Sequence, residues 1–181
     1  LFDGTETYIK QAYLAFFVFA VFFSGRIFAL PQGINKRTHE KGELFMYKKI
    51  LIPVDGSEKS QAAVRKGAEM ASIFGATVTL FHVVPVLTID RFRSIIIDEA
   101  KTQGGELLKQ AASEIAEFNI PMDTEMVPGH PADAICLKAR MDEYDLIVMG
   151  SRGLSGVKGY LMGSVSSTVT SHAPCAVLIV R

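Results

Sequence analysis

The chain has 181 residues, of which 49% are hydrophobic and 9% aromatic, and this suits one domain of about 135 residues with a buried core plus an additional segment. Lysine plus arginine and aspartate plus glutamate number 19 each, so charge does not favour binding to nucleic acid or to an acidic membrane surface. The two cysteines, Cys136 and Cys175, lie in apolar segments without metal-binding or redox spacing. We therefore expect buried thiols in a reducing compartment.

Residues 1–45 differ in character from the rest of the chain. An unbroken apolar run extends from Ala12 to Phe23, which is short for a membrane-spanning helix of roughly 20 apolar residues. Extension of the run from Tyr8 to Leu30 would supply that length, so a membrane anchor is one interpretation. A signal peptide is a second one, although Asp3 and Glu6 precede the run and no small-x-small cleavage site follows it.

A third interpretation of this segment is that it is translated upstream sequence. Lys41-Gly42-Glu43 can be encoded by a purine-rich ribosome-binding sequence, and Met46 follows shortly afterwards, directly before the first predicted strand. We therefore divide the chain into an N-terminal extension, residues 1–45, and a domain, residues 46–181.

The first part of the domain contains two predicted strands with a helix between them. Lys48 to Val54 is a nearly continuous apolar run, as expected of a strand that helices cover on both faces. It ends at Asp55-Gly56-Ser57, where Ser57 is a suitable N-cap for a helix that ends at Gly75. The second strand, Thr77 to Val84, is rich in β-branched and apolar residues.

The alternation of helices and strands continues to the end of the chain. A long helix with an apolar face from Ile97 to Phe118 contains Gly104-Gly105, which we expect to weaken or bend it. Asp123 to Val127 is a short and polar strand, so we place it at an edge of the sheet. The remaining predicted elements are a helix over 131–141, a strand over 146–149, a helix from residue 164 and a strand over 176–180.

A glycine-rich segment follows the fourth predicted strand. Glycines at positions 150, 153, 156, 159 and 163 precede a serine-rich helix start, and Arg152 adds positive charge. Glycine lets the backbone approach a ligand closely, and the first-turn amides of a helix favour an anion. The sequence therefore predicts a phosphate-binding loop; the alternative is a surface loop that is merely rich in glycine.

The alternation as a whole predicts an α/β fold with a doubly wound, five-stranded parallel sheet, helices on both faces and strand order 3-2-1-4-5. Such sheets bind ligands at their carboxyl edge, where the strand order reverses. The first and fourth strands flank this point and end in Asp55 and Gly150, so we expect the ligand site there.

Several motifs between Met46 and Arg181 resemble those of the universal stress protein family. Gly150-x2-Gly153-x9-Gly163-Ser164 is similar to the ATP-binding motif of that family. MYKKILIPVDGS, LFHVVP and GHPADAI resemble its first strand, its second strand and the turn into its third helix. The resemblance implies a cytoplasmic, usually dimeric protein of the stress response that binds ATP with Mg²⁺.

The resemblance also implies a set of nucleotide-binding residues. Pro53, Val54 and Asp55 would contact the adenosine, with Asp55 accepting hydrogen bonds from the ribose hydroxyls. Val83 would offer backbone groups to the adenine, and Met149 would line the entry. The phosphates would be held by residues of the glycine-rich segment and the helix start: Gly150, Arg152, Gly153, Gly163, Ser164, Val165 and Ser166.

Some of these residues have simpler explanations as well. Asp55 could only cap the following helix. His82 lies in an apolar strand, and we expect it to be a structural histidine with its hydrogen bonds satisfied rather than a ligand-binding one.

Three functions are compatible with the sequence. A regulatory ATP-binding module is favoured, because no Asp or Glu occurs between Gly150 and Arg181 to hold the metal that phosphoryl transfer requires. An ATPase on the same fold and a nucleotide-free dimeric interaction protein are the alternatives. The apolar last strand, Ala176 to Val180, is expected at a sheet edge and predicts a homodimer through that edge. We expect a cytoplasmic protein, or a membrane-anchored one if residues 1–45 are native.

Overall fold

The structure is a computed structural model of the chain, and it describes residues 46–85, 93–154 and 162–181, with the backbone alone for residues 93–98. The predicted N-terminal extension, residues 1–45, lies outside the described residues, as do Gly156 and Gly159 of the glycine-rich segment. Within the described ranges, no helix has both the length and the apolar character needed to cross a membrane.

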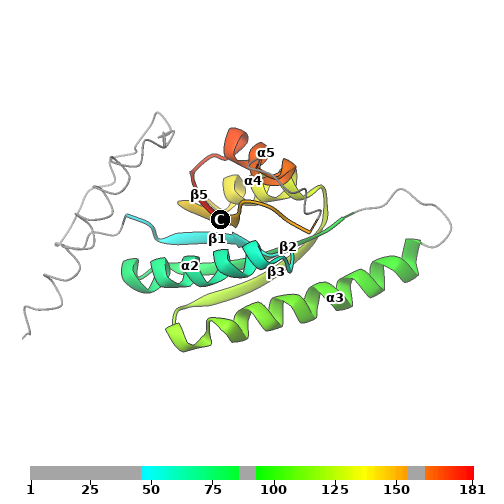
Figure 1. Ribbon diagram of the computed structural model, residues 1–181, viewed down its shortest axis with the longest axis horizontal. Coiled ribbons are helices and arrows are strands. Elements are labelled where there is room, and N and C mark those ends of the chain that lie inside the picture. The colour runs from blue at the N-terminus through cyan, green and yellow to red at the C-terminus, as the bar shows by residue number, and fades with distance from the viewer. Residues whose placement is uncertain (1–45, 86–92, 155–161) are drawn as a thin grey trace, which may run out of the picture. The chain divides into compact units, whose positions relative to one another are not determined.

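Five parallel strands form one sheet in the order β3-β2-β1-β4-β5, with β1 at its centre (Figure 1). Both the predicted parallel α/β fold and the predicted strand order 3-2-1-4-5 are confirmed. The order reverses between β1 and β4, which are hydrogen-bonded neighbours. The strands are β1 (Lys49–Pro53), β2 (Thr77–Pro85), β3 (Met122–Gly129), β4 (Leu146–Gly150) and β5 (Ala176–Val180).

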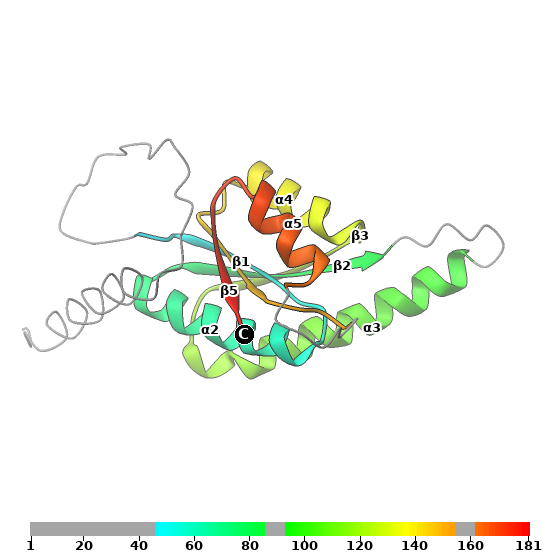
Figure 2. The same cartoon turned by 45° about the horizontal axis from the view of Figure 1, so that its top comes forward.

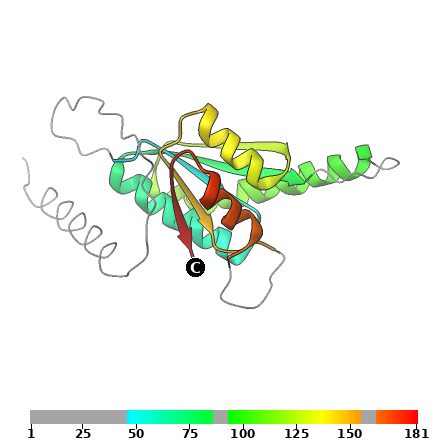
Figure 3. The same ribbon diagram turned by 90° about the horizontal axis from the view of Figure 1, so that it is seen from above.

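Helices cover both faces of the sheet, as Figures 2 and 3 show. α2 (Glu58–Phe74) and α3 (Arg93–Glu114) pack on one face, and α3 is followed by the 3-10 turn η1 (Ala116–Phe118). α4 (Pro131–Met141) and α5 (Ser164–His172) pack on the opposite face. The N-terminus of α5 therefore approaches the sheet from the face that α2 does not cover.

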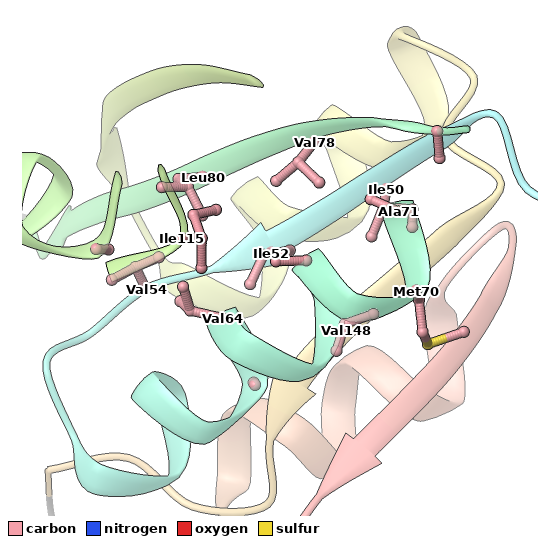
Figure 4. Close-up of a cluster of buried hydrophobic side chains, with 14 of the residues drawn as sticks. Ile50, Ile52, Val54, Val64, Met70, Ala71, Val78, Leu80, Ile115 and Val148 are labelled. Atoms are coloured by element: carbon pink, nitrogen blue, oxygen red, sulfur yellow. The ribbon is translucent and has the colours of Figure 1, made fainter. Parts of the chain in front are cut away.

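The hydrophobic core has two parts, because successive residues of a strand point to opposite faces of the sheet. Ile50 and Ile52 of β1 belong to the cluster beneath α2 and α3 (Figure 4), whereas Leu51 belongs to the cluster beneath α4 and α5. All three side chains are fully buried. This burial on both faces explains the continuous apolar run in the sequence.

α2 has the predicted ends. The hydroxyl of Ser57 accepts a hydrogen bond from the amide of Ser60, and Gly75 closes the helix in the left-handed conformation at φ 65°, with its amide bonded to the carbonyl of Ala71. Glycine adopts this conformation without the steric penalty that a Cβ would cause. The turn into α2 is therefore fixed at Ser57, two residues after Asp55.

β3 and α3 differ from the predictions. β3 extends over Met122–Gly129 because it pairs with β2 along its whole length, and it lies at the sheet edge as predicted. α3 runs without interruption through Gly104 and Gly105, where the sequence predicts a weakened or bent helix, and it ends at Glu114. Gly104 is buried, and a Cβ there would lie 2.6 Å from Cδ2 of His82, so packing against β2 favours glycine.

Both cysteines are partly buried rather than fully buried. They pack at the margin of the cluster beneath α4 and α5. Burial raises the pKa of the Cys175 thiol to about 12, so this thiol stays protonated at neutral pH. Cys136 and Cys175 therefore act as small apolar residues, in agreement with the role predicted for them.

Gly67→Ala should destabilise the domain, whereas Gly105→Ala should stabilise it. Both glycines lie inside helices, where alanine is favoured by about 1 kcal/mol. A Cβ on Gly67 would lie 2.3 Å from Cδ1 of the buried Ile52, and overpacking of this kind costs about 1–3 kcal/mol, whereas a Cβ on Gly105 would meet nothing within 4 Å. Urea unfolding of the two variants measures the difference, and equal midpoints would contradict the packing described here.

Candidate functional site

The carboxyl ends of β1 and β4 lie side by side at the point where the strand order reverses. The segments that follow them also meet, because a Cβ on Gly153 would lie only 2.4 Å from Oδ2 of Asp55. The acidic turn after β1 and the glycine-rich segment after β4 are far apart in sequence. The fold thus brings together the two segments in which the sequence predicts ligand-binding residues.

Asp55 shapes the turn from β1 into α2. Its Oδ1 accepts hydrogen bonds from the amide of Ser57 at 3.0 Å and from the hydroxyl of Ser57 at 2.7 Å. Its own amide donates to Oγ of Ser60 at 3.2 Å, and Gly56 adopts the left-handed φ of 82° that this turn requires. One carboxylate oxygen is therefore used inside the turn, and the other, Oδ2, lies against Gly153.

Ser57 connects this turn to the segment after β4. Its hydroxyl lies 2.7 Å from Oδ1 of Asp55 and 3.3 Å from the carbonyl oxygen of Arg152. A hydroxyl has one proton to donate, so it serves one of these acceptors at a time, and the shorter distance favours Asp55. The N-cap residue of α2 thus contacts both the turn after β1 and the segment after β4.

Two of the three glycines of the binding motif, Gly150 and Gly153, are required by close packing within the protein. None of Gly150, Gly153 and Gly163 has a positive φ. A Cβ on Gly150 would lie 2.7 Å from a backbone carbon in the first turn of α2, whereas one on Gly163 would lie at an ordinary contact distance of 3.4 Å from the backbone of Arg152. Gly153 leaves room for the carboxylate of Asp55. The motif therefore allows loops to approach one another, whether or not a ligand is bound.

Ser151 and Ser166 attach α5 to the end of β4. The buried hydroxyl of Ser166 lies 2.9 Å from the carbonyl oxygen of Ser151 and 3.0 Å from that of Gly163. The amide of Gly163 also donates to the carbonyl of Ser151, at 2.9 Å, and the amide of Ser151 donates to the carbonyl of Val180, at 2.7 Å. The side chain of Ser166 and the amide of Gly163 therefore bond within the protein and position α5.

The first turn of α5 presents backbone amides. Gly163 is the N-cap of this helix and has no side chain that could accept a hydrogen bond from them. An α-helix does not itself satisfy the first N–H groups of its chain, and its dipole places partial positive charge there. Ser164 is exposed and Val165 is half-buried, so the start of α5 can accept an anion such as a phosphate group.

The apolar residues predicted to contact adenosine lie on both faces of the sheet. Val83 and Met149 are 8% and 5% exposed and belong to the cluster beneath α4 and α5. Val54 is 4% exposed and belongs to the cluster beneath α2 and α3, while the carbonyl of Pro53 lies 3.4 Å from Oγ of Ser60. These four residues border the carboxyl edge of the sheet, and their side chains belong largely to the core.

Sequence reasoning identifies Ser57 as the cap of α2 but not its bond to Asp55, and it does not identify the contributions of Ser60 and Ser151 to this site. The Asp55-x-Ser57 spacing is typical of a turn in which a carboxylate bonds the backbone two residues later, and it could have indicated that contact. The bonds of Ser60 and Ser151 join different segments of the chain. No local pattern predicts such bonds.

Known proteins resemble this chain over the same range of residues. The model described as the Universal stress protein family matches residues 46–181. A universal stress protein of Methanocaldococcus jannaschii is 37% identical over 141 residues, which cover 75% of this chain and 83% of that protein.

Solved structures agree with these sequence comparisons. The universal stress protein UspA from Lactobacillus plantarum has a TM-score of 0.69 and 28% identity, covering 75% of this chain and 98% of that chain. A universal stress protein solved in complex with cAMP has a TM-score of 0.62 and 26% identity, over 75% and 98%. One from Archaeoglobus fulgidus, in complex with dAMP, has a TM-score of 0.58 and 26% identity, over 75% and 99%.

Ser57→Ala should lower the free energy of unfolding by about 1 kcal/mol, because it removes the N-cap of α2 and a hydrogen bond to Asp55. Ser57→Thr keeps the hydroxyl and should lose much less. Urea unfolding of both variants checks the expectation. If the alanine and threonine variants unfold at the same urea concentration, the hydroxyl does not have the role assigned to it.

Proposed function

The chain belongs to the universal stress protein family, and we propose that it binds an adenine nucleotide where the ends of β1 and β4 meet. The observation that carries the proposal is the contact between Asp55 and the glycine-rich segment, beside the start of a helix that no side chain caps. An acceptor for sugar hydroxyls and donors for phosphate then border one edge of the sheet. ATP is the ligand that we propose.

The phosphates would bind at the start of α5. The amides of Ser164 and Val165, together with the exposed side chain of Ser164, are suitable donors at the positive end of the helix dipole. Arg152 would add a charged donor, and the close packing at Gly150 and Gly153 would keep the backbone of the segment near the ligand. Gly163 and Ser166 would act indirectly, by holding α5 against Ser151.

The ribose would bind at Asp55, whose Oδ2 is not used in the turn into α2 and can accept from a sugar hydroxyl. An ionised carboxylate is an acceptor only, so it selects a hydroxyl-bearing group over a phosphate at this position. Pro53, Val54 and Met149 would provide the apolar border of the adenosine site.

The adenine would bind to the backbone of Val83. β1 ends opposite Phe81, whereas β2 continues to Pro85. The carbonyl of Phe81 accepts from the amide of Val54 and so points toward β1, and the backbone groups of Val83, two residues later, point to the same side. Beyond the end of β1 these groups have no partner in the β1–β2 ladder, which suits them to hydrogen bonding with a base.

Relatives of known structure support an adenine nucleotide as the ligand. Two universal stress proteins with 26% identity to this chain were solved with cAMP and with dAMP. Both ligands contain adenine, a sugar and phosphate, the three groups for which the edge of this sheet offers partners. ATP has two more phosphates than these ligands, and the glycine-rich segment and α5 would provide hydrogen-bond donors for them.

Regulated binding is a better proposal than efficient catalysis. Phosphoryl transfer requires a metal ion held by carboxylates, and no Asp or Glu occurs between Gly150 and Arg181. Among the described residues, no three metal-binding side chains come together. Mg²⁺ would therefore enter on the phosphates of ATP, with water completing its coordination. Nucleotide occupancy would change the state of the protein, with slow hydrolysis at most.

The proposed partner is a second copy of the chain, bound along β5. This strand lies at one edge of the sheet, and all five of its residues, Ala176 to Val180, are apolar and half-buried. The opposite edge, β3, carries Asp123, Glu125 and Pro128, which disfavour pairing with another strand. A symmetric dimer through β5 would cover the apolar edge and leave the charged edge in water.

The division into domains is part of the same proposal. Residues 46–181 would form the working unit, because the family match covers this range. Residues 1–45 would be a separate extension. We propose a cytoplasmic location for the domain, where a reducing environment would keep the thiols of Cys136 and Cys175 free.

Protein purified without added nucleotide, then denatured, should release an adenine nucleotide, and added ATP with magnesium chloride should raise the melting temperature by mass action. Gly153→Ala should weaken ATP binding at least about tenfold, because the new Cβ would displace the carboxylate of Asp55. Gly105→Ala is the matched control and should bind ATP normally. Absence of both released nucleotide and a thermal shift would contradict the proposal.

The purified protein should be a dimer by light scattering at micromolar concentration, and Ile179→Lys on β5 should convert it to a monomer. A lysine within this apolar pairing edge would be desolvated without a partner. Thr124→Lys, on the exposed part of β3, is the control and should remain dimeric. A monomeric unmodified protein, or a dimer that only Thr124→Lys disrupts, would refute pairing through β5.

A further inference from the structure

A side chain of β2 binds the carbonyl of the first residue after β1, next to the candidate site. Nδ1 of His82 lies 2.7 Å from the carbonyl oxygen of Val54. A carbonyl oxygen only accepts hydrogen bonds, so Nδ1 must carry the proton and donate it. The amide of Val54 donates to the carbonyl of Phe81 at 2.8 Å, and both backbone groups of Val54 are therefore bound to β2.

The imidazole ring of His82 packs closely against α3 at Gly104. Gly104 of α3 is buried, and a Cβ on it would lie 2.6 Å from Cδ2 and 3.0 Å from Nε2 of His82. Met126, which lies opposite His82 on β3, would be 2.7 Å from the same Cβ through its sulfur. The ring thus lies between two strands and a helix, and glycine at position 104 makes this arrangement possible.

The bond to Val54 comes where regular strand pairing has ended. The β1–β2 ladder stops at Pro53 and Phe81, and Asp55 follows Val54 directly. The chain then turns at Gly56 with a φ of 82°. Without the imidazole, the carbonyl of Val54 would have no hydrogen-bond partner among the described residues, and the position of Asp55 would depend on its bonds with Ser57 and Ser60 and on its packing against Gly153.

We infer that His82 is a positioning residue for the nucleotide site: by binding the carbonyl of Val54, it fixes the direction in which Asp55 leaves the sheet. The inference rests on the proposed function, because the carboxylate of Asp55 is the group assigned to the ribose. Gly104 of α3 would then influence the site indirectly, because the absence of a side chain at position 104 leaves room for the imidazole ring of His82. The effect passes from α3 through His82 and Val54 to Asp55.

The variants His82→Asn and His82→Leu separate the hydrogen bond from the packing. The amide nitrogen of asparagine occupies the same position along the side chain as Nδ1 of histidine and can donate to Val54, whereas leucine only fills space. His82→Leu should weaken the binding of ATP with magnesium chloride about tenfold, the effect of one lost hydrogen bond, and His82→Asn should stay within about threefold of the unmodified protein.

Amide hydrogen exchange in the nucleotide-free protein provides a readout that does not depend on the ligand. The amides of Asp55 and Ser57 are bonded to Ser60 and to the Asp55 carboxylate, so they report the turn directly. In His82→Leu they should exchange faster, relative to the central β4 amide of Val148, than in the unmodified protein. In His82→Asn the ratio should be unchanged.

Gly104→Ala displaces the ring without removing the donor, and it keeps the inference testable if His82→Leu does not fold. It should show the same loss of ATP affinity and the same local exchange as His82→Leu, while Gly105→Ala should behave as the unmodified protein. Long-range proton–nitrogen NMR should find the His82 proton on Nδ1.

The outcomes distinguish the two proposals. If exchange at Asp55 and Ser57 rises only in proportion to that at Val148, or if His82→Leu binds ATP as tightly as His82→Asn, the positioning role is refuted. If the unmodified protein binds no ATP but the local exchange changes as expected, the nucleotide proposal fails and the effect of His82 on the turn is upheld.

Discussion

The contact between the carboxylate of Asp55 and the backbone of Gly153 is the constraint on which the rest of the site depends. It joins the two segments that leave neighbouring strands at the reversal of strand order. One oxygen of the carboxylate bonds Ser57 and so fixes the start of α2, while the other faces the glycine-rich segment. A single side chain thus contacts the turn after β1, the start of α2 and the facing segment after β4.

The motif glycines have roles in the packing of the protein itself. Gly150 lets the first turn of α2 approach β4, Gly153 admits the carboxylate of Asp55, and Gly163 begins α5 while its amide bonds Ser151. None of them needs a left-handed backbone. The motif thus builds a compact edge in which first-turn amides of α5 are presented and the carbonyls of Ser151 and Gly163 are already bonded.

Most of the architecture could be predicted from the sequence, because it follows from local patterns. The apolar run of β1, the cap at Ser57 and the glycine at position 75 each identify one element through short-range chemistry. The uninterrupted α3 could not be predicted, since the packing that favours glycine at position 104 is made with His82 of another element, β2. The bonds of Ser166 and Gly163 to Ser151 could not be predicted either, because they too join separate segments of the chain. In the sequence, Ser166 and Gly163 suggest a direct contact with phosphate.

Nucleotide and protein would compete for few groups at this edge, because the side chain of Ser166 bonds within the protein while no side chain caps the first turn of α5. Titration of nitrogen-labelled protein with ATP and magnesium chloride, followed by amide NMR, tests this most directly. We predict saturable shifts that are largest at Asp55, Val83, Ser164 and Val165. Shifts confined to other surfaces, such as the exposed face of α3, would contradict the account.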